Sequence, residues 1–330
     1  MNVSSAPHMA PIFHRALSGL LTGLMTLALA PSCHTVSIAP RPGKKLASGQ
    51  FEWEPRRSPS GPVLVVVSLD DQIAYVYRNG TQIGRSTVHL DGPVETGVFT
   101  VLPRQETAET TGAWKGIPML EENHSAGPET RAAVRLPRAF SELVSGATGL
   151  GATVVITRKN SPPAQSDKPT SVLLSSDVQI RPEDVAGEGE FWDPALSDEG
   201  PVAILLSVAD RMVYVYRSGI LIGKSGVTIL PGQDSGAQSA VFVMLEGELA
   251  EESEVVPGVR QRPWAVLNLD GSGSPTDPVA ELRKRLRIPK SFGQRVYPLL
   301  QPGTLLIVTR QTVAPKDRPG ADFAIFGPGT

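Results

Sequence analysis

GPVLVVVSLDDQIAYVYRNGTQIGRSTV, residues 61–88, decides the fold, because the chain repeats it as GPVAILLSVADRMVYVYRSGILIGKSGV at 200–227. Aligned without gaps, the two stretches are identical at 14 of 28 positions. The continuous apolar run near each start is typical of a strand buried on both faces, and the alternating residues that follow predict a hairpin. Asn79-Gly80 and, more weakly, Ser218-Gly219 supply the hairpin turns, because such residues tolerate positive φ.

The duplication extends over most of the chain. Upstream, WEP at 53–55 corresponds to WDP at 192–194, and downstream, after an offset of 13 residues, LPRAF at 136–140 corresponds to IPKSF at 288–292. Copies of more than a hundred residues are longer than the units of solenoid proteins. The sequence therefore predicts two tandem domains, at 51–178 and 190–328, with a linker at 179–189.

The same alignment predicts which residues are structurally equivalent. Ser68 should correspond to Ser207, Tyr75 to Tyr214 and Gly151 to Gly303. Further strands are expected at 97–102 and 240–245. Helix is scarce, so the predicted fold class is mostly β with short helices.

Two short helices are expected. One covers Arg138–Val144. The other starts at Asp277-Pro278, as N-cap and first helical residue, and places Val279, Leu282 and Leu286 on one face.

The N-terminus is typical of export. His14-Arg15 precede an uncharged apolar stretch that ends in small residues, which predicts a secretory signal peptide at 1–32. Cys33 is the only cysteine, so a disulfide within the chain is impossible. Its position suits lipid attachment in a bacterial lipoprotein, followed by a flexible tether at 33–50; Ala30-x-Ser32 suits an ordinary signal peptidase instead. The expected location is the periplasm, with the membrane reached only through the lipid.

The overall charge argues against nucleic acid as a partner, and the histidine and cysteine content argues against a metal site. The net charge is −2, so no basic field favours nucleic acid. Five scattered histidines and a single cysteine show no metal-ligand spacing, so we expect neither a metal nor a cofactor.

The order of these segments resembles the catalytic domain of the L,D-transpeptidase family. The resemblance rests on the hairpin at 67–88, ETGVFTVL at 95–102, VRLP at 134–137 before a short helix, and GATVVIT at 151–157. It covers nearly all of the first copy and, less closely, the second. It implies mostly β, sandwich-like domains that act on peptidoglycan stem peptides. It also implies a cysteine nucleophile in a Ser-His-Gly-Cys-Val-Arg-Leu-Pro motif, with another histidine upstream.

Neither copy retains the groups that this chemistry needs. A thiolate is the nucleophile and an imidazole takes its proton. In the first copy the motif region reads TRAAVRLP at 130–137, so Ala133 stands at the nucleophile, Arg131 at the base and Leu120 at the upstream histidine. In the second copy Arg285 takes the nucleophile position and Arg283 the base position. The chain is therefore expected to be catalytically inactive.

The retained and neighbouring cations are the candidate binding residues. Arg135 keeps its motif position, where it either meets a substrate carboxylate or ties down a loop. Arg283, Arg285 and Arg287 could meet an anionic partner, as could the nearby Arg260, Arg262 and Lys284, or they form a solvated face balanced by the acidic loop at 246–254.

Three hypotheses remain. The leading one is a peptidoglycan-binding or scaffolding protein without catalysis. The first alternative is an active peptidoglycan transferase with an unrecognised nucleophile, for which Ser125, Thr130 and the neighbouring His124 are the candidates; His124 and His89 otherwise read as exposed loop residues. The second alternative is a structural envelope lipoprotein.

Overall fold

The computed structural model describes residues 45–94, 96–101, 114–115, 134–158, 164–166, 189–230, 239–253, 256–269, 282 and 285–313. Several predictions fall outside these residues: the signal peptide with Cys33, most of the tether and linker, and the positions Leu120, His124, Ser125, Thr130, Arg131, Ala133, Arg283 and Lys284. Within the described part no helix is long and apolar enough to cross a membrane.

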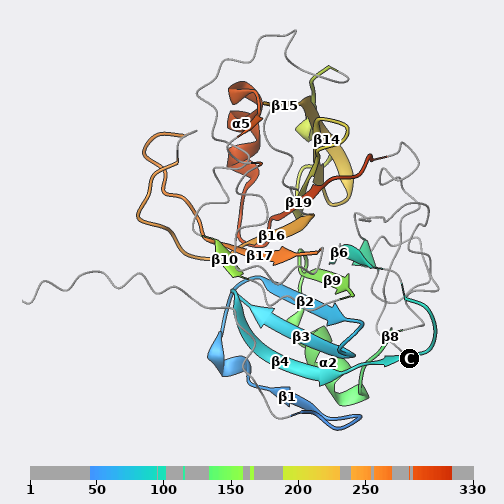
Figure 1. Ribbon diagram of the computed structural model, residues 1–330. Helices are drawn as coiled ribbons and strands as arrows, with labels where there is room; N and C mark the ends of the chain where they lie inside the picture. Colours follow the sequence, from blue (N-terminus) through green and yellow to red (C-terminus); the bar gives the residue numbers. More distant parts are fainter. Residues whose placement is uncertain are drawn as a thin grey trace, which may run out of the picture. The chain divides into compact units, whose positions relative to one another are not determined.

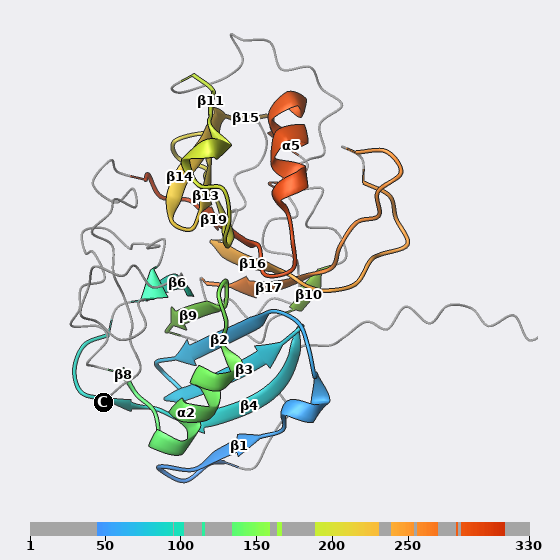
Figure 2. The same ribbon diagram turned by 180° about the vertical axis from the view of Figure 1, so that it is seen from behind.

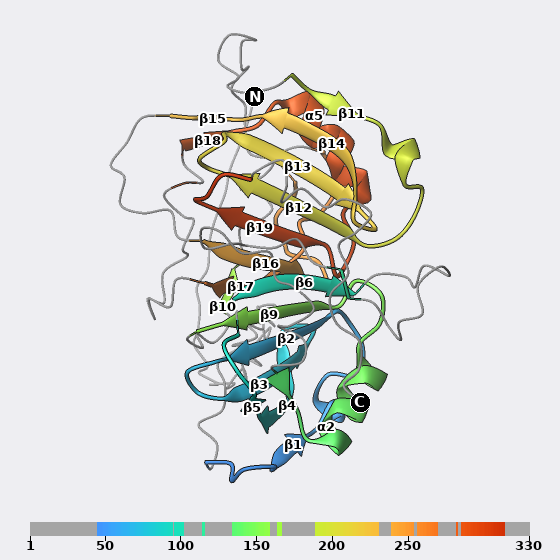
Figure 3. The same ribbon diagram turned by 90° about the vertical axis from the view of Figure 1, so that its right-hand side faces the viewer.

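Each copy supplies one large sheet (Figure 1). The first runs in the order β1 (Phe51–Trp53), β4 (Thr81–Thr87), β3 (Ile73–Arg78), β2 (Val63–Ser68), β9 (Thr153–Thr157), β6 (Gly97–Val101), β7 (Trp114–Lys115). The second runs in the order β11 (Phe191–Trp192), β14 (Ile220–Gly226), β13 (Met212–Arg217), β12 (Val202–Ser207), β19 (Leu305–Thr309), β16 (Ala240–Met244), β17 (Trp264–Asn268), β10 (Ala164–Ser166). Apart from β10 the two orders are the same. Figure 3 shows the labelled strands of both sheets in this order.

Strand register confirms the predicted equivalences. Ser68 pairs with Ile73 and Thr157, and Ser207 pairs in the same way with Met212 and Thr309. The central pair, β2 with β9 or β12 with β19, is parallel in both copies, and its neighbours are antiparallel.

The hairpin turns follow the predicted chemistry. Asn79 and Gly80 adopt φ of 45° and 77°, and Ser218 and Gly219 adopt 49° and 80°. Positive φ at both central residues matches the right-handed twist of the flanking strands. Asn79 and Ser218 are thus short polar residues in a backbone conformation that residues with bulkier side chains rarely adopt.

A helix covers one face of each sheet (Figure 2). α2 (Arg138–Ala147) confirms the predicted first helix and buries Phe140 and Val144. α5 (Lys290–Val296) is its equivalent in the second copy and buries Phe292 and Val296. Short 3-10 turns complete the set: η1 (Pro55–Arg57), η3 (Pro194–Leu196) and η4 (Tyr297–Leu299).

The predicted helix does not extend to Leu286, and its expected start at Asp277, Pro278 and Val279 lies outside the described residues. Leu286 and Arg287 form β18, which pairs with β15 (Thr228–Ile229), although Leu282 and Arg285 have helical backbone. The apolar spacing of Leu282 and Leu286 is real, since both are buried. Ladder hydrogen bonds to a strand more than fifty residues away override the local helical preference of the segment.

The mostly β prediction is confirmed. In the described residues each copy has one large sheet and a two-stranded ladder, and no second large sheet packs on it within the same copy. In the first sheet Val63, Val65 and Val67 pack beneath α2. Leu64 and Val66 point to the opposite face, as alternation requires, and enter a core shared with the second copy. Two covering layers explain why all six residues of β2 are buried.

The shared core consists mainly of second-copy residues. Its buried members are Leu64, Val66, Tyr77, Val98 and Val155 from the first copy, and Ala203, Leu205, Met212, Tyr214, Tyr216, Val241, Val243, Leu245, Ala265, Leu267, Leu305 and Ile307 from the second. Polar contacts accompany it: the Glu246 backbone N–H donates to Asn79 Oδ1 at 2.7 Å, and Ser60 Oγ donates to Glu246 Oε2 at 3.0 Å. In addition, β10 belongs in sequence to the predicted first copy, 51–178, but pairs with β17 of the second.

An ion pair distinguishes the first copy from the second. Arg85 on β4 donates from Nε and Nη2 to the two carboxylate oxygens of Glu52 on β1, at 2.7 and 2.8 Å. This hydrogen bonding lowers the pKa of Glu52, although partial burial of the carboxyl acts in the opposite direction. The equivalent residues of the second copy are Lys224 and Phe191, which cannot form such a pair.

The lowered pKa of Glu52 predicts how stability depends on pH. A carboxyl whose pKa is lower in the folded than in the unfolded state adds stability above its unfolded pKa and loses it as pH falls through the folded pKa. Between about pH 5 and pH 3 the free energy of unfolding should therefore fall more for the wild type than for Glu52→Gln. The difference should stay below about 1 kcal/mol, because the Glu52 side chain is 51% exposed.

Urea denaturation at a series of pH values measures this difference. Glu54→Gln removes a carboxylate two residues away, whose closest approach to Arg57 is 3.7 Å, and serves as the matched control. Parallel pH curves for the wild type and Glu52→Gln would contradict the assignment.

Candidate functional site

The strand that carries Val134 and Arg135 lies in a two-stranded ladder in the first copy. β8 (Val134–Arg135) pairs antiparallel with β5 (His89–Leu90), with His89 opposite Arg135. β5 follows the hairpin strand β4, and β8 leads directly into α2. The ladder therefore fixes the backbone of Arg135 through a segment that is 44 or more residues away in sequence.

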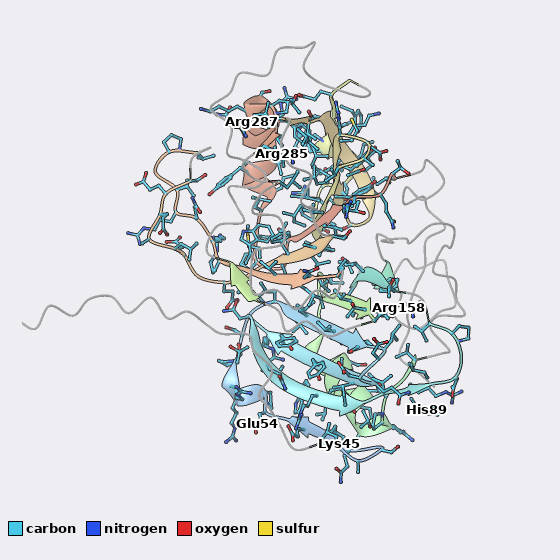
Figure 4. All side chains as sticks on the ribbon, in the orientation of Figure 1. Lys45, Glu54, His89, Arg158, Arg285 and Arg287 are labelled. Carbon is cyan, nitrogen blue, oxygen red and sulfur yellow. The ribbon has the colours of Figure 1, made fainter. Side chains whose placement is uncertain are left out.

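One carboxylate joins the two cross-strand partners. Asp91 Oδ2 accepts from Nε of Arg135, and Asp91 Oδ1 lies 3.0 Å from Nε2 of His89. The side chains of Arg135 and His89 are 67% and 76% exposed, whereas that of Asp91 is 30% exposed. Figure 4 labels His89, which extends outward from the first copy. The arrangement is an exposed Arg–Asp–His cluster at one end of the ladder.

This cluster bears on both hypotheses for Arg135, that it ties down a loop and that it meets a substrate carboxylate. The contact with Asp91 fits the loop-tying role, because it links the residue after β5 to β8. A guanidinium has five N–H donors, however, and Asp91 engages the Nε side. The Nη groups can therefore still meet an anionic ligand from solvent. His89 is exposed, as predicted, but it lies in a strand and not in a loop.

Asp91 is the residue that sequence reasoning missed. The available signal was an acidic residue two positions after His89, in the segment that pairs with the VRLP strand in the structure. It could not be used, because nothing local shows that β5 and β8 pair.

The second copy repeats the ladder but not the cluster. Thr228 stands opposite Arg287, as His89 stands opposite Arg135. Leu230 takes the position of Asp91, so the carboxylate is not repeated. Arg285 Nε donates to the backbone oxygen of Leu230 at 2.7 Å, and Arg287 Nη1 donates to that of Leu286 at 2.9 Å. Both arginines lie just before α5 (Figure 4) and are half-buried.

Arg260 of the basic segment and the former catalytic positions are the remaining sequence candidates. Arg260 forms a backbone bridge with Glu252, so it lies against the acidic loop at 246–254, as the solvated-face reading expects. Of the predicted former catalytic positions, only Arg285 is among the residues the structure describes. Its hydrogen bond to the backbone oxygen of Leu230 links two segments of the second copy. Across the described ranges, no group of three His, Cys, Asp or Glu side chains could hold a metal ion.

Comparison with known proteins adds no further assignment. No protein-family model, curated protein or solved structure matches this chain.

Proposed function

We propose that this is an exported protein of the bacterial cell envelope that binds peptidoglycan stem peptides without processing them. The proposal extends the resemblance to the L,D-transpeptidases, whose substrates carry free carboxylates, to a chain that lacks the nucleophile. Binding and catalysis are separable, because function lies in sites and not in folds.

The observation that supports it most is the state of Arg135. Its backbone is held in the β5–β8 ladder while 67% of its side chain remains accessible. A positioned, exposed guanidinium is the group best suited to meet a carboxylate through two parallel hydrogen bonds. Asp91, which also contacts His89, restricts its orientation, so less conformational entropy is lost when a ligand binds.

A structural envelope role is the second candidate, and one observation favours it. The arginines of the second copy bond to backbone carbonyls, which stabilises the ladder. On this account the two copies form a scaffold and neither ladder recognises a ligand.

Binding to purified peptidoglycan sacculi separates the two candidates. Wild-type protein should co-sediment with sacculi, and Arg135→Ala should weaken that binding about tenfold, the loss of one charge-assisted hydrogen bond. Arg158→Ala, which removes an exposed arginine elsewhere in the first copy, should bind like the wild type. Arg287→Ala alters the equivalent position of the second copy and shows whether that ladder contributes.

Two results would count against the proposal. If Arg135→Ala and Arg158→Ala bind equally well, Arg135 is only structural. If the wild type does not bind sacculi at all, the scaffold becomes the better account.

We also propose a periplasmic location with a lipid anchor at Cys33. The supporting observation is the apolar stretch that ends at the only cysteine of the chain. Cys33→Ser should move the protein from the membrane to the soluble fraction, and labelled palmitate should mark only the wild type. Wild-type protein found wholly in the soluble periplasm would favour ordinary signal cleavage.

A further inference from the structure

A row of five side chains, four of them polar, crosses the first sheet on the face that meets the second copy. Cross-strand register places the row in the order Gln82, Tyr77, Leu64, Thr153, Thr100. Directly paired residues project from the same face of a sheet. Leu64 and Tyr77 belong to the core shared by the two copies, so the whole row faces that core.

Four atoms of this row are buried without a hydrogen-bond partner among the described residues: Gln82 Oε1, the Tyr77 hydroxyl, and the Oγ1 atoms of Thr153 and Thr100. The exposed fractions of these residues range from 0% to 9%. Most buried polar groups are hydrogen-bonded, and leaving one unsatisfied is costly. Four in one row are therefore not a random scatter of defects.

The second copy repeats only the tyrosine of this row, as Tyr216. Val243 and Leu305 stand where the first copy has Thr100 and Thr153, and Leu221 stands where it has Gln82. The fold thus accepts apolar side chains at these positions. The polar residues of the first copy call for their own physical explanation.

We propose that ordered water occupies this row and bridges its side chains inside the shared core. Thr100 and Thr153 are direct cross-strand neighbours, and so are Tyr77 and Gln82. Such neighbours have Cβ atoms about 5 Å apart. In the two threonines Oγ1 is bonded directly to Cβ, so one water molecule can span the Thr100–Thr153 pair. Each water would then gain at least two partners, the minimum for a stable buried site.

The chemistry of the row points to water rather than to a charged ligand. Its groups are two hydroxyls, a phenol and an amide, all neutral. Burial raises the pKa of Tyr77, so its hydroxyl keeps the proton and acts as a donor. Hydroxyls both donate and accept, as water does, whereas an ion would lack a counter-charge within the row.

A high-resolution crystal structure of the full chain and a pair of variants test the proposal. Electron density should show water within hydrogen-bonding distance of Thr100 and Thr153 Oγ1. Thr100→Val/Thr153→Val keeps the side-chain shape but removes the partners of the water, so Tm should fall by about 2–6 °C. Thr304→Val calibrates the shift, because Thr304 Oγ1 accepts a known bond from the Gln301 backbone N–H.

A dry row gives the opposite result. Valine would then relieve two unsatisfied hydroxyls, and a Tm equal to or above that of the wild type overturns the proposal. The absence of water density beside both threonines also overturns it. The wild-type density decides the matter if the double variant does not fold.

Discussion

The purified protein is expected to show no L,D-transpeptidase or carboxypeptidase turnover on tetrapeptide muropeptides. It should also form no covalent adduct with a carbapenem. In the family that the sequence resembles, these β-lactams acylate the nucleophilic thiolate, and Ala133 and Arg285 offer no thiol. Removing a nucleophile that acts as a unit with its base costs on the order of 10⁶ in rate.

Intact-mass measurement after carbapenem exposure checks this prediction. The measurement should use Cys33→Ser, because Cys33 is the only thiol in the chain and could react without belonging to either copy. An active L,D-transpeptidase treated in parallel shows that the reagent is competent. A stoichiometric adduct on Cys33→Ser would mean that another residue is the nucleophile, with Ser125, which is next to His124, or Thr130 as the first candidates. The proposal of a non-catalytic binding protein would then fail.

The elements of the fold were predictable because their signals are local. The alternation in 73–78 and the turn at Asn79-Gly80 specify one hairpin, and the repeat specifies its equivalent. Even the register could be transferred between copies, since a slip by one residue would turn each core side chain to the other face.

The packing between the copies was not predictable from the same signals. The uninterrupted burial of VLVVVS shows that both faces of β2 are covered, but not by what. In the structure α2 covers one face and the second copy covers the other. An apolar pattern records burial and not the identity of the partner.

The candidate site shows the same limit at the level of single residues. The position of Arg135 in a retained VRLP segment was visible in the sequence. Its contacts with Asp91 depend on the pairing of β5 with β8, which is long-range. The failed helix prediction at Leu286 has the same cause, because β15 pairs with that segment from far away in the chain.

Replacing Gly84 by alanine is expected to lower the free energy of unfolding by about 2–3 kcal/mol. Gly84 on β4 pairs with Trp53 on β1, and a Cβ at Gly84 would lie 2.4 Å from Trp53 Cε3. The indole cannot move away freely, because its other neighbour is the ring of Phe140 on α2, edge-on at a centroid distance of 5.7 Å. The added methyl group must therefore displace the edge strand or the helix.

The second copy provides an independent test of the same geometry. A Cβ at Gly223 would lie 2.4 Å from Trp192 Cε3, and Trp192 packs edge-on against Phe292 at 5.5 Å. Gly223→Ala should therefore destabilise by a similar amount.

Urea denaturation of the single variants and of Gly84→Ala/Trp53→Leu measures these effects. The smaller leucine leaves room for the methyl group, so the double variant should lose less stability than the sum of its single changes. Gly146→Ala is the control, because no atom lies within 4 Å of its added Cβ. On helix α2 it should gain up to about 1 kcal/mol. If Gly84→Ala stays within about 0.5 kcal/mol of the wild type, the close contact between Gly84 and the Trp53 ring cannot be a constraint on the fold.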